Sequence, residues 1–320
     1  MTPLVVVDQL KKFFPLSRGR QLHAVDGVSL TVHEREIVGL VGESGSGKST
    51  FGKAVVGLHS KTAGQVRYRG AALPQTYSPA DFQRNAKTMQ MIFQDPYSSL
   101  NPRMTVGEIV GEGPKLHSGL SKQDIRDSVA IWLSRVGLEP DHMSRYPHEF
   151  SGGQRQRIGI ARALILEPEF VVCDEPISAL DVSVQAQVVN LLEELQASMG
   201  LSLLFIAHDL SMVRYVSNRM AVMYLGGLVE IGPSADVFFN PAHPYTRILI
   251  ASNPEPDPNY ERKRQSTTIT GEIPSPINIG PGCRFAGRCP QVMDVCRHTT
   301  PALLPLPANP DRQVACHLFG

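Results

Sequence analysis

A glycine-rich segment that directly follows a short apolar run places the tightest limits on the fold of this chain. Residues 36–41 (EIVGLV) predict a buried strand, and residues 42–49 (GESGSGKS) follow without a break. These eight residues fit the pattern G-x-x-x-x-G-K-[ST], in which backbone N–H groups surround a polyphosphate and a helix begins at the lysine. The strand, the loop and the expected helix together predict a phosphate-binding loop in an α/β fold.

The residue types of this loop suit the binding of a nucleotide. Gly42, Gly45 and Gly47 allow backbone angles and a close approach that a Cβ atom would forbid. Lys48 is expected to reach the β- and γ-phosphates, and the Ser49 hydroxyl is expected to bind Mg²⁺. The remaining members of the candidate ATP-binding set in this segment are Glu43, Ser44, Ser46 and Thr50.

Charge and hydropathy exclude several classes of function. The 31 basic and 30 acidic side chains give a net charge of +1, so nucleic acid is not expected as a partner. A bilayer span needs about 18–20 apolar residues, whereas the best run, residues 201–207, has seven. Residues 1–10 lack a basic lead into an apolar run, so no secretion signal is expected. We therefore expect a cytoplasmic chain that reaches a membrane only through partners.

Alternating strands and helices predict an α/β core with a mainly parallel sheet. Strands are expected at residues 5–7, 28–32, 36–41, 64–70, 170–173 and 202–207, with a hairpin at 220–231. Helices are expected at residues 48–56, 106–136, 151–166 and 182–199. Within 106–136, the pattern places Ile131, Trp132 and Val136 on one apolar face. Prolines accumulate after Ser252 and the periodicity ends, which predicts a mostly irregular extension.

Polar side chains suited to catalysis come directly after the expected strands. Asp174 and Glu175 come directly after the apolar run 170–173, so Asp174 can hold Mg²⁺ and Glu175 can accept a proton from the attacking water. His208 follows the next strand, at the sheet edge where open α/β proteins bind ligands. Gln94 lies between a strand and a loop, where its amide can contact Mg²⁺ and water. A helix-capping acidic pair, a structural histidine and an ordinary loop glutamine are the alternatives.

A second motif reveals a family resemblance. Ser151, Gly152, Gly153 and Gln154, followed by Arg-Gln-Arg, resemble the signature of ABC (ATP-binding cassette) ATPases. The loop 42–49, Gln94, the signature, segment 170–175, the D-loop 178–181 and His208 match that family in order across about residues 3–250. The resemblance implies a P-loop NTPase core with an antiparallel β subdomain and a helical subdomain at about residues 95–165.

The same resemblance implies how the site works. Family members form head-to-tail dimers that enclose two ATP molecules, so the four signature residues would act in trans on the γ-phosphate. Ser49, Gln94 and Asp174 would hold Mg²⁺, and Glu175 and His208 would be catalytic. An aromatic side chain would stack on adenine. Phe14 fits that role best, with Phe13 the neighbour with which it could be confused.

Finer features resemble the ATPases of dipeptide and oligopeptide permeases, in particular the second ATPase subunit of the pair. The segments concerned are 94–102 (QDPYSSLNP), 240–246 (NPAHPYT), 271–276 (GEIPSP) and the run SGGQRQR from residue 151. The resemblance implies a nucleotide-binding domain at 3–251 and an extension at 252–320. It also implies a second ATPase subunit, two transmembrane permease subunits and, indirectly, a periplasmic substrate-binding protein. The chain would be peripheral on the cytoplasmic face of the bacterial inner membrane.

Other functions stay open at this point. The same importer class also includes systems for nickel, glutathione and opines. Soluble ABC proteins that act on ribosomes or DNA are disfavoured, because Lys48 and Ser151 are only 103 positions apart and the chain has one cassette.

Four of the five cysteines lie near the end of the chain: Cys283, Cys289, Cys296 and Cys316. In a reducing compartment this clustering favours a metal or free thiols over disulfides. The spacing lacks the short C-x₂₋₄-C pairs of structural zinc sites, and the permease ATPases that the chain resembles include members with a [4Fe–4S] cluster in this extension. An iron–sulfur cluster, zinc and free thiols remain the alternatives. Cys173, within an apolar strand, is expected to be a small core residue.

Overall fold

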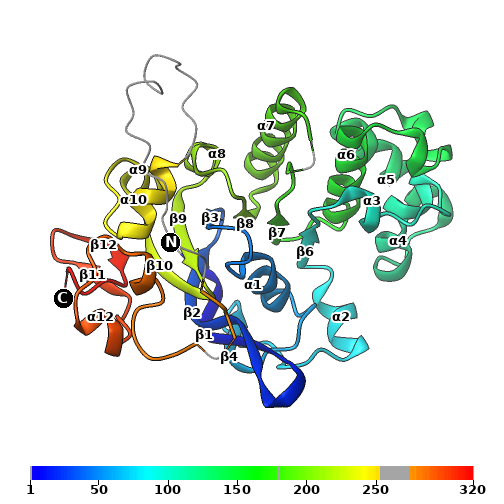
Figure 1. Ribbon diagram of the computed structural model, residues 1–320. Coiled ribbons are helices and arrows are strands. Elements are labelled where there is room, and N and C mark those ends of the chain that lie inside the picture. Colours follow the sequence, from blue (N-terminus) through cyan, green and yellow to red (C-terminus); the bar gives the residue numbers. More distant parts are fainter. Residues whose placement is uncertain (1, 179, 253–273, 278, 320) are drawn as a thin grey trace. The chain divides into compact units, whose positions relative to one another are not determined.

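The computed structural model describes residues 2–178, 180–252, 274–277 and 279–319 (Figure 1). Two compact units can be distinguished. The first unit comprises Met1–Leu4, Val32–Glu36 and Thr76–Ile206, and the second comprises Val5–Thr31, Ile37–Gln75 and Ala207–Gly320. Ala179 of the expected D-loop and residues 271–273 of one permease-like segment lie outside the described residues.

The second unit contains a mixed sheet in which β3 (Ile37–Val41) pairs in parallel with β9 (Arg219–Tyr224). From β9 the order continues through antiparallel neighbours: β10 (Gly227–Pro233), β12 (Asn309–Val314) and β11 (Leu304–Leu306). The helices of this unit include α1 (Lys48–Val55), α8 (Leu210–Val216), α9 (Ser234–Phe239) and α10 (Pro244–Ala251). Helix α8 packs closely on β3, since a Cβ atom on Gly39 would lie 2.1 Å from Cγ1 of Val213. The expected parallel strand and the hairpin at 220–231 are thereby confirmed.

A second, antiparallel sheet lies mainly in the same unit. Its order is β2-β1-β4-β5, with the bounds β1 (Pro3–Pro15), β2 (Gln21–His33), β4 (Ala63–Tyr68) and β5 (Ala71–Ala72). A short 3-10 helix, η1 (Ser17–Gly19), lies between β1 and β2. Both long strands extend well beyond the expected segments 5–7 and 28–32, and β1 has a register shift between Asp8 and Lys11 in its pairing with β4.

The first unit contains three parallel strands in the order β6 (Met89–Ile92), β7 (Phe170–Asp174) and β8 (Ser202–Ile206). Every residue of β7 and β8 is buried, as expected for continuous apolar runs in a parallel sheet. Helix α7 (Val182–Met199) has the expected bounds and ends at Gly200, which has a left-handed backbone.

Helices make up most of the remainder of the first unit, and four of them gather around one another in green and cyan in Figure 1: α3 (Pro96–Ser99), α4 (Val106–His117), α5 (Lys122–Arg135) and α6 (Gly152–Leu164). Helix α2 (Pro79–Asn85) lies apart from this group, and the 3-10 turns are η2 (Pro140–Ser144) and η3 (Pro147–Glu149). Capping boxes fix several helix starts, because Ser78, Thr105, Ser121 and Ser151 each accept a hydrogen bond from the N–H three residues on.

The expected helical character of the segment 106–136 is confirmed. The segment forms two helices, and the break between them contains Gly119 with a φ of +68°. The expected apolar face is partly wrong, since Trp132 is 3% and Val136 0% exposed whereas Ile131 is 57% exposed. Positions 132 and 136 are four residues apart and share a helix face, but position 131 points about 100° away from position 132.

The extension is more ordered than its proline content predicts. It includes the 3-10 helix η4 (Ala286–Arg288), α12 (Val295–His298) and the hairpin β11–β12. Strand β12 pairs with β10 through Glu230↔Val314 and Ile231↔Gln313, and Val314 packs with Ala242 and Leu306. Most of the described part of the extension is irregular, as expected, and this hairpin is the exception. Among the residues that the structure describes, no helix has the length and apolar character needed to cross a membrane.

Candidate functional site

The phosphate-loop segment joins β3 to α1, as its sequence predicts. Gly47 has a φ of +104°, and a Cβ atom there would lie 2.0 Å from the carbonyl oxygen of Ala24. Gly45 has a φ of +77° with no atom within 4 Å of its would-be Cβ. Packing therefore requires glycine at position 47, whereas Gly45 presents bare backbone to open space, as an incoming phosphate needs.

Lys48 is buried, and its side chain contacts the backbone of its own loop. Its Nζ donates hydrogen bonds to the carbonyl oxygens of Gly42, at 2.8 Å, and Glu43, at 3.0 Å. The hydroxyl of Ser46 is buried and has no hydrogen-bond partner among the described residues. A cationic donor, an uncommitted buried hydroxyl and an open glycine form a donor set that fits a polyphosphate. Ser44 is exposed, and Ser49 and Thr50 lie half-buried in the first turn of α1.

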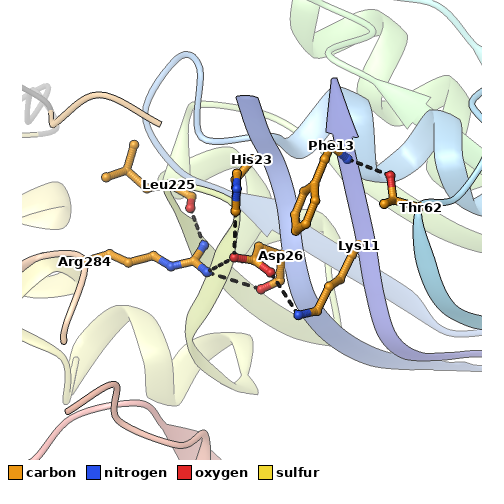
Figure 2. A network of polar contacts seen from close by, with 7 residues as sticks. All are labelled: Lys11, Phe13, His23, Asp26, Thr62, Leu225 and Arg284. Carbon is orange, nitrogen blue, oxygen red and sulfur yellow. Dashed lines mark hydrogen bonds and ion pairs between the residues drawn. The ribbon is translucent and has the colours of Figure 1, made fainter. Parts of the chain in front are cut away.

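The two candidate adenine-stacking residues have different neighbours. Phe13 stacks on His23 with ring centroids 4.0 Å apart, and its N–H donates to Thr62 (Figure 2). Phe14 meets His59 edge-on at 5.6 Å, and the Nζ of Lys12 lies 4.8 Å from its ring centre. The assignment of Phe14 to adenine stays a prediction. His208, the other expected site residue of this unit, is exposed.

In the first unit, Gln94 and Glu175 come together although 81 positions separate them in the sequence. Nε2 of Gln94 donates to Oε2 of Glu175 at 2.8 Å, and the Glu175 N–H donates to the Ile206 carbonyl at 3.0 Å. Glu175 has a φ of +45°, a left-handed conformation that is rare outside glycine and is concentrated at functional sites. Asp174, the last residue of β7, is 2% exposed. The Asp174 carboxylate is therefore buried at the end of β7, whereas the Glu175 carboxylate contacts the amide of Gln94.

The signature motif forms the start of α6. Ser151 is the exposed N-cap and accepts from the Gln154 N–H at 3.3 Å, while Gln154 Oε1 accepts from the Ser151 N–H at 3.0 Å. A Cβ atom on Gly153 would lie 2.4 Å from Cγ1 of Val184 in α7, so glycine is needed there for helix packing. The capped helix terminus leaves Ser151 and Gly152 accessible, which suits contact with an anion.

Sequence reasoning included Glu43 in the candidate ATP site, but it missed Asp26 and the contacts that the extension makes with both acidic residues. Arg288 makes a bidentate ion pair with Glu43 of the phosphate loop. Arg284 contacts Asp26 of β2 at 2.8 Å and the Leu225 carbonyl, and Lys11 reaches Asp26 from β1 at 3.4 Å (Figure 2). Although burial raises the pKa of Asp26, the hydrogen bond from His23 and the nearby cationic charges lower it overall. One hint of these contacts is present in the sequence: Arg284 and Arg288 are each adjacent to a cysteine, Cys283 and Cys289.

The four terminal cysteines form no disulfide. Burial raises the pKa of Cys283, and the charges of Cys296, Cys316 and Cys289 add to this rise, against a hydrogen bond from the Phe285 backbone that lowers it. The Cys283 N–H also donates to the Cys296 carbonyl at 2.7 Å. Nevertheless, within the described part of the chain no three His, Cys, Asp or Glu side chains are grouped to hold a metal ion. Cys173 is fully buried, which raises its pKa to about 12 and agrees with a core role.

Comparison with known proteins agrees with these motifs. The family model described as ABC transporter matches residues 25–178, and the model described as oligopeptide/dipeptide transporter, C-terminal region, matches residues 229–296. The putative oligopeptide transport ATP-binding protein YkfD of Bacillus subtilis is 54% identical over 318 residues, covering 99% of this chain and 96% of that protein. The oligopeptide transport ATP-binding protein OppF of Salmonella typhimurium is 53% identical over 310 residues, covering 94% and 92%.

Solved structures show the same fold. The dimeric ATP-binding cassette MJ0796, bound to ADP and phosphate in a post-hydrolysis state, has a TM-score of 0.66 and 26% identity over 72% of this chain and 99% of its own. The cassette cbiO1 of Clostridium perfringens has a TM-score of 0.65 and 26% identity over 75% and 92%. The expected α/β class is thereby confirmed. The chain belongs to the ABC transporter family of ATP-binding proteins, in the group that carries the oligopeptide/dipeptide transporter C-terminal region.

Proposed function

We propose that this protein is the ATP-hydrolysing subunit of a bacterial ABC importer for dipeptides or oligopeptides. The observation that carries the ATPase assignment is Glu175, a carboxylate in a strained left-handed conformation at the end of β7, hydrogen-bonded to Gln94. The peptide cargo is supported by the names of the relatives that match over nearly the whole chain. We also propose a division into a nucleotide-binding domain at 3–251 and an extension at 252–320.

Each site residue has one role in the proposed reaction. Lys48 and the loop N–H groups bind the β- and γ-phosphates. Ser49, Gln94 and Asp174 would hold Mg²⁺, which would neutralise phosphate charge. Glu175 orients a water molecule and accepts its proton as the water oxygen bonds to the γ-phosphorus and the bond to the bridging β-oxygen breaks. His208 is the second catalytic residue, and Phe14 stacks on adenine.

The proposed transporter also requires partner subunits. Ser151, Gly152, Gly153 and Gln154 act in trans on the ATP of a second, non-identical ATPase subunit in a head-to-tail dimer. The accessible capped start of α6 supports this role, and so does the dimeric form of the related cassette MJ0796. Two transmembrane permease subunits bind the chain at the cytoplasmic face of the inner membrane, and a periplasmic binding protein delivers the cargo to them. ATP closes the dimer through its higher affinity for the closed state.

Replacement of Glu175 by glutamine tests the ATPase assignment. Glu175→Gln is expected to retain ATP binding and to lower steady-state hydrolysis in the assembled transporter by about 10²-fold or more, because only the proton acceptor is lost. Glu194→Gln, at an exposed position of α7, is the matched control and is expected to hydrolyse normally. Near-normal turnover of Glu175→Gln would refute the role of this carboxylate.

Transport assays test the cargo. Vesicles that contain the reconstituted transporter and its binding protein are expected to accumulate labelled di- or oligopeptides in an ATP-dependent manner. Accumulation of nickel, glutathione or an opine without any peptide uptake would contradict the peptide assignment while leaving the ATPase assignment intact.

We propose further that Cys283, Cys289, Cys296 and Cys316 together hold one [4Fe–4S] cluster that orders the extension. The 2.7 Å hydrogen bond from the Cys283 N–H to the Cys296 carbonyl, which brings two of the four residues together, supports this proposal; the side-chain positions do not, since the described residues offer no group placed around a single ion. Anaerobically purified protein is expected to be brown, to contain about four irons per chain and to lose its colour in Cys289→Ser. Zinc in place of iron, or neither metal, would contradict the cluster and favour the zinc or the free-thiol alternative.

A further inference from the structure

Glu43, the second residue of the phosphate loop, has every polar group engaged. Its N–H donates to the hydroxyl of Tyr245 at 2.9 Å, and its carbonyl accepts from Nζ of Lys48 at 3.0 Å and from the Ser46 N–H at 3.2 Å. Its carboxylate accepts from Nη1 and Nη2 of Arg288 at 2.9 and 3.0 Å. The backbone of this one residue therefore sets the positions of the loop lysine and of Ser46, and its side chain is fixed from the extension.

Arg288 is committed to this contact. It lies at the end of η4, immediately before Cys289, and is 8% exposed. Besides the two bonds to Glu43, Nη1 donates to the hydroxyl of Tyr224 at 3.2 Å, while Nε has no hydrogen-bond partner among the described residues. The hydrogen bonds from its guanidinium to Glu43 raise the pKa of Arg288. A bidentate guanidinium–carboxylate pair combines neutralisation with a fixed orientation.

The charge of Glu43 makes this contact relevant to nucleotide binding. A carboxylate in a loop that receives a polyphosphate repels the ligand unless a cation neutralises it. Arg288 supplies that cation at hydrogen-bond distance in a largely buried environment, where screening by solvent is weak. Without Arg288, the carboxylate would be both uncompensated and free to change rotamer next to the loop that receives the polyphosphate.

We propose that Arg288 is a positioning residue for ATP binding: it neutralises and fixes Glu43, and thereby couples the cysteine-bearing extension to the phosphate loop. The inference rests on the proposed ATP-binding function and deepens it. Because Cys289 follows Arg288 directly, loss of order in this part of the extension is transmitted to the loop.

The test compares ATP affinity and stability of full-length variants. Arg288→Ala is expected to weaken ATP binding by about fivefold or more, the usual lower range for coupling between sites. The double variant Arg288→Ala/Glu43→Gln is expected to recover much of that affinity, because the uncompensated carboxylate is gone. Arg288→Lys keeps the charge but not the planar fork and is expected to fall between wild type and alanine. Equilibrium titration with ATP at two salt concentrations measures the dissociation constant of each of these three variants and of the wild type.

A matched control separates positioning from general stability. Arg312 also joins the extension to the core through a buried pair, 2.7 Å from Oε1 of Glu230, but it lies in β12 rather than at the loop. Arg312→Ala is expected to lower the melting temperature while its ATP affinity stays within about twofold of wild type, because the hydrogen bonds of Arg312 go to Glu230 and Asn240 and not to the phosphate loop.

Three outcomes would overturn the inference. They are wild-type ATP affinity in Arg288→Ala, equal losses in the Arg288→Ala and Arg312→Ala variants, and no recovery in the double variant. If Arg288→Ala does not fold, wild-type ATP affinity in Arg288→Lys would overturn the inference instead. Failure of the wild-type protein to bind ATP would instead overturn the proposed function.

Discussion

Acid is expected to destabilise this protein through one buried imidazole, that of His243. The side chain is 1% exposed and caps α10, with Nδ1 accepting from the Tyr245 N–H at 3.0 Å. The backbone N–H of His243 donates to Oε2 of Glu230 at 2.9 Å, which further fixes the cap. Burial, assisted by the charge of Arg247, lowers the pKa of His243 to about 4. The imidazole is therefore neutral in the folded protein at neutral pH.

The size of the effect follows from the two pKa values. An unfolded histidine titrates near 6.5, so the folded value of about 4 is lower by about 2.5 units. At about 1.4 kcal/mol per unit, this difference corresponds to about 3 kcal/mol of the free energy of unfolding. Between pH 6.5 and 4 the unfolded chain binds a proton that the folded chain does not, so stability falls as the pH drops through this window. Above pH 6.5 the contribution is constant.

Urea unfolding of the full chain at pH 7.5, 5.5 and 4.5 measures this loss. His243→Asn is the reference variant, because asparagine also caps helices but does not titrate. The stability of wild type relative to the variant is expected to fall by up to about 1.4 kcal/mol per pH unit below pH 6. All other titrating groups cancel in this comparison. Parallel pH profiles for the two proteins would refute the assignment of a neutral, buried His243.

Two further predictions concern the loop and the helical part of the first unit. Gly47→Ala is expected to cost at least about 1–3 kcal/mol of stability and to weaken ATP binding, because the new Cβ would lie 2.0 Å from the Ala24 carbonyl. Gly45→Ala is the control, because it shares the left-handed backbone strain but its Cβ meets no atom, so it is expected to lose less stability than Gly47→Ala. Equal losses in chemical denaturation would contradict the steric reasoning. Trp132→Ala is expected to cost about 3–5 kcal/mol, and Ile131→Ala about 0.5 or less, since the side chains are 3% and 57% exposed. Similar unfolding midpoints for these two variants would show that position 131 is also part of the core.

Local patterns predicted much of the fold because they act over a few residues. The run 170–173 became a fully buried strand, the helix at 182–199 has the expected bounds, and Ser151 caps α6 as its spacing to Gln154 indicates. The phosphate loop was recognisable for the same reason, since a strand, a glycine turn and a helix start are encoded within fifteen residues. Periodicity was weaker evidence for single side chains, as Ile131 shows.

The sequence by itself therefore determined the α/β class, the loop that fits a polyphosphate and the placement of Glu175 after a buried strand. Only the tertiary structure decided that β12 pairs with β10 and that Arg288 binds Glu43, a contact between residues 245 positions apart. The β12 segment Asn309–Val314 contains a proline and two charged residues and becomes a strand because β10 supplies its hydrogen-bond partners. Local sequence patterns predict secondary structure because it depends on residues close together in the chain. The pairing of an arginine with a distant carboxylate depends instead on how the whole chain folds.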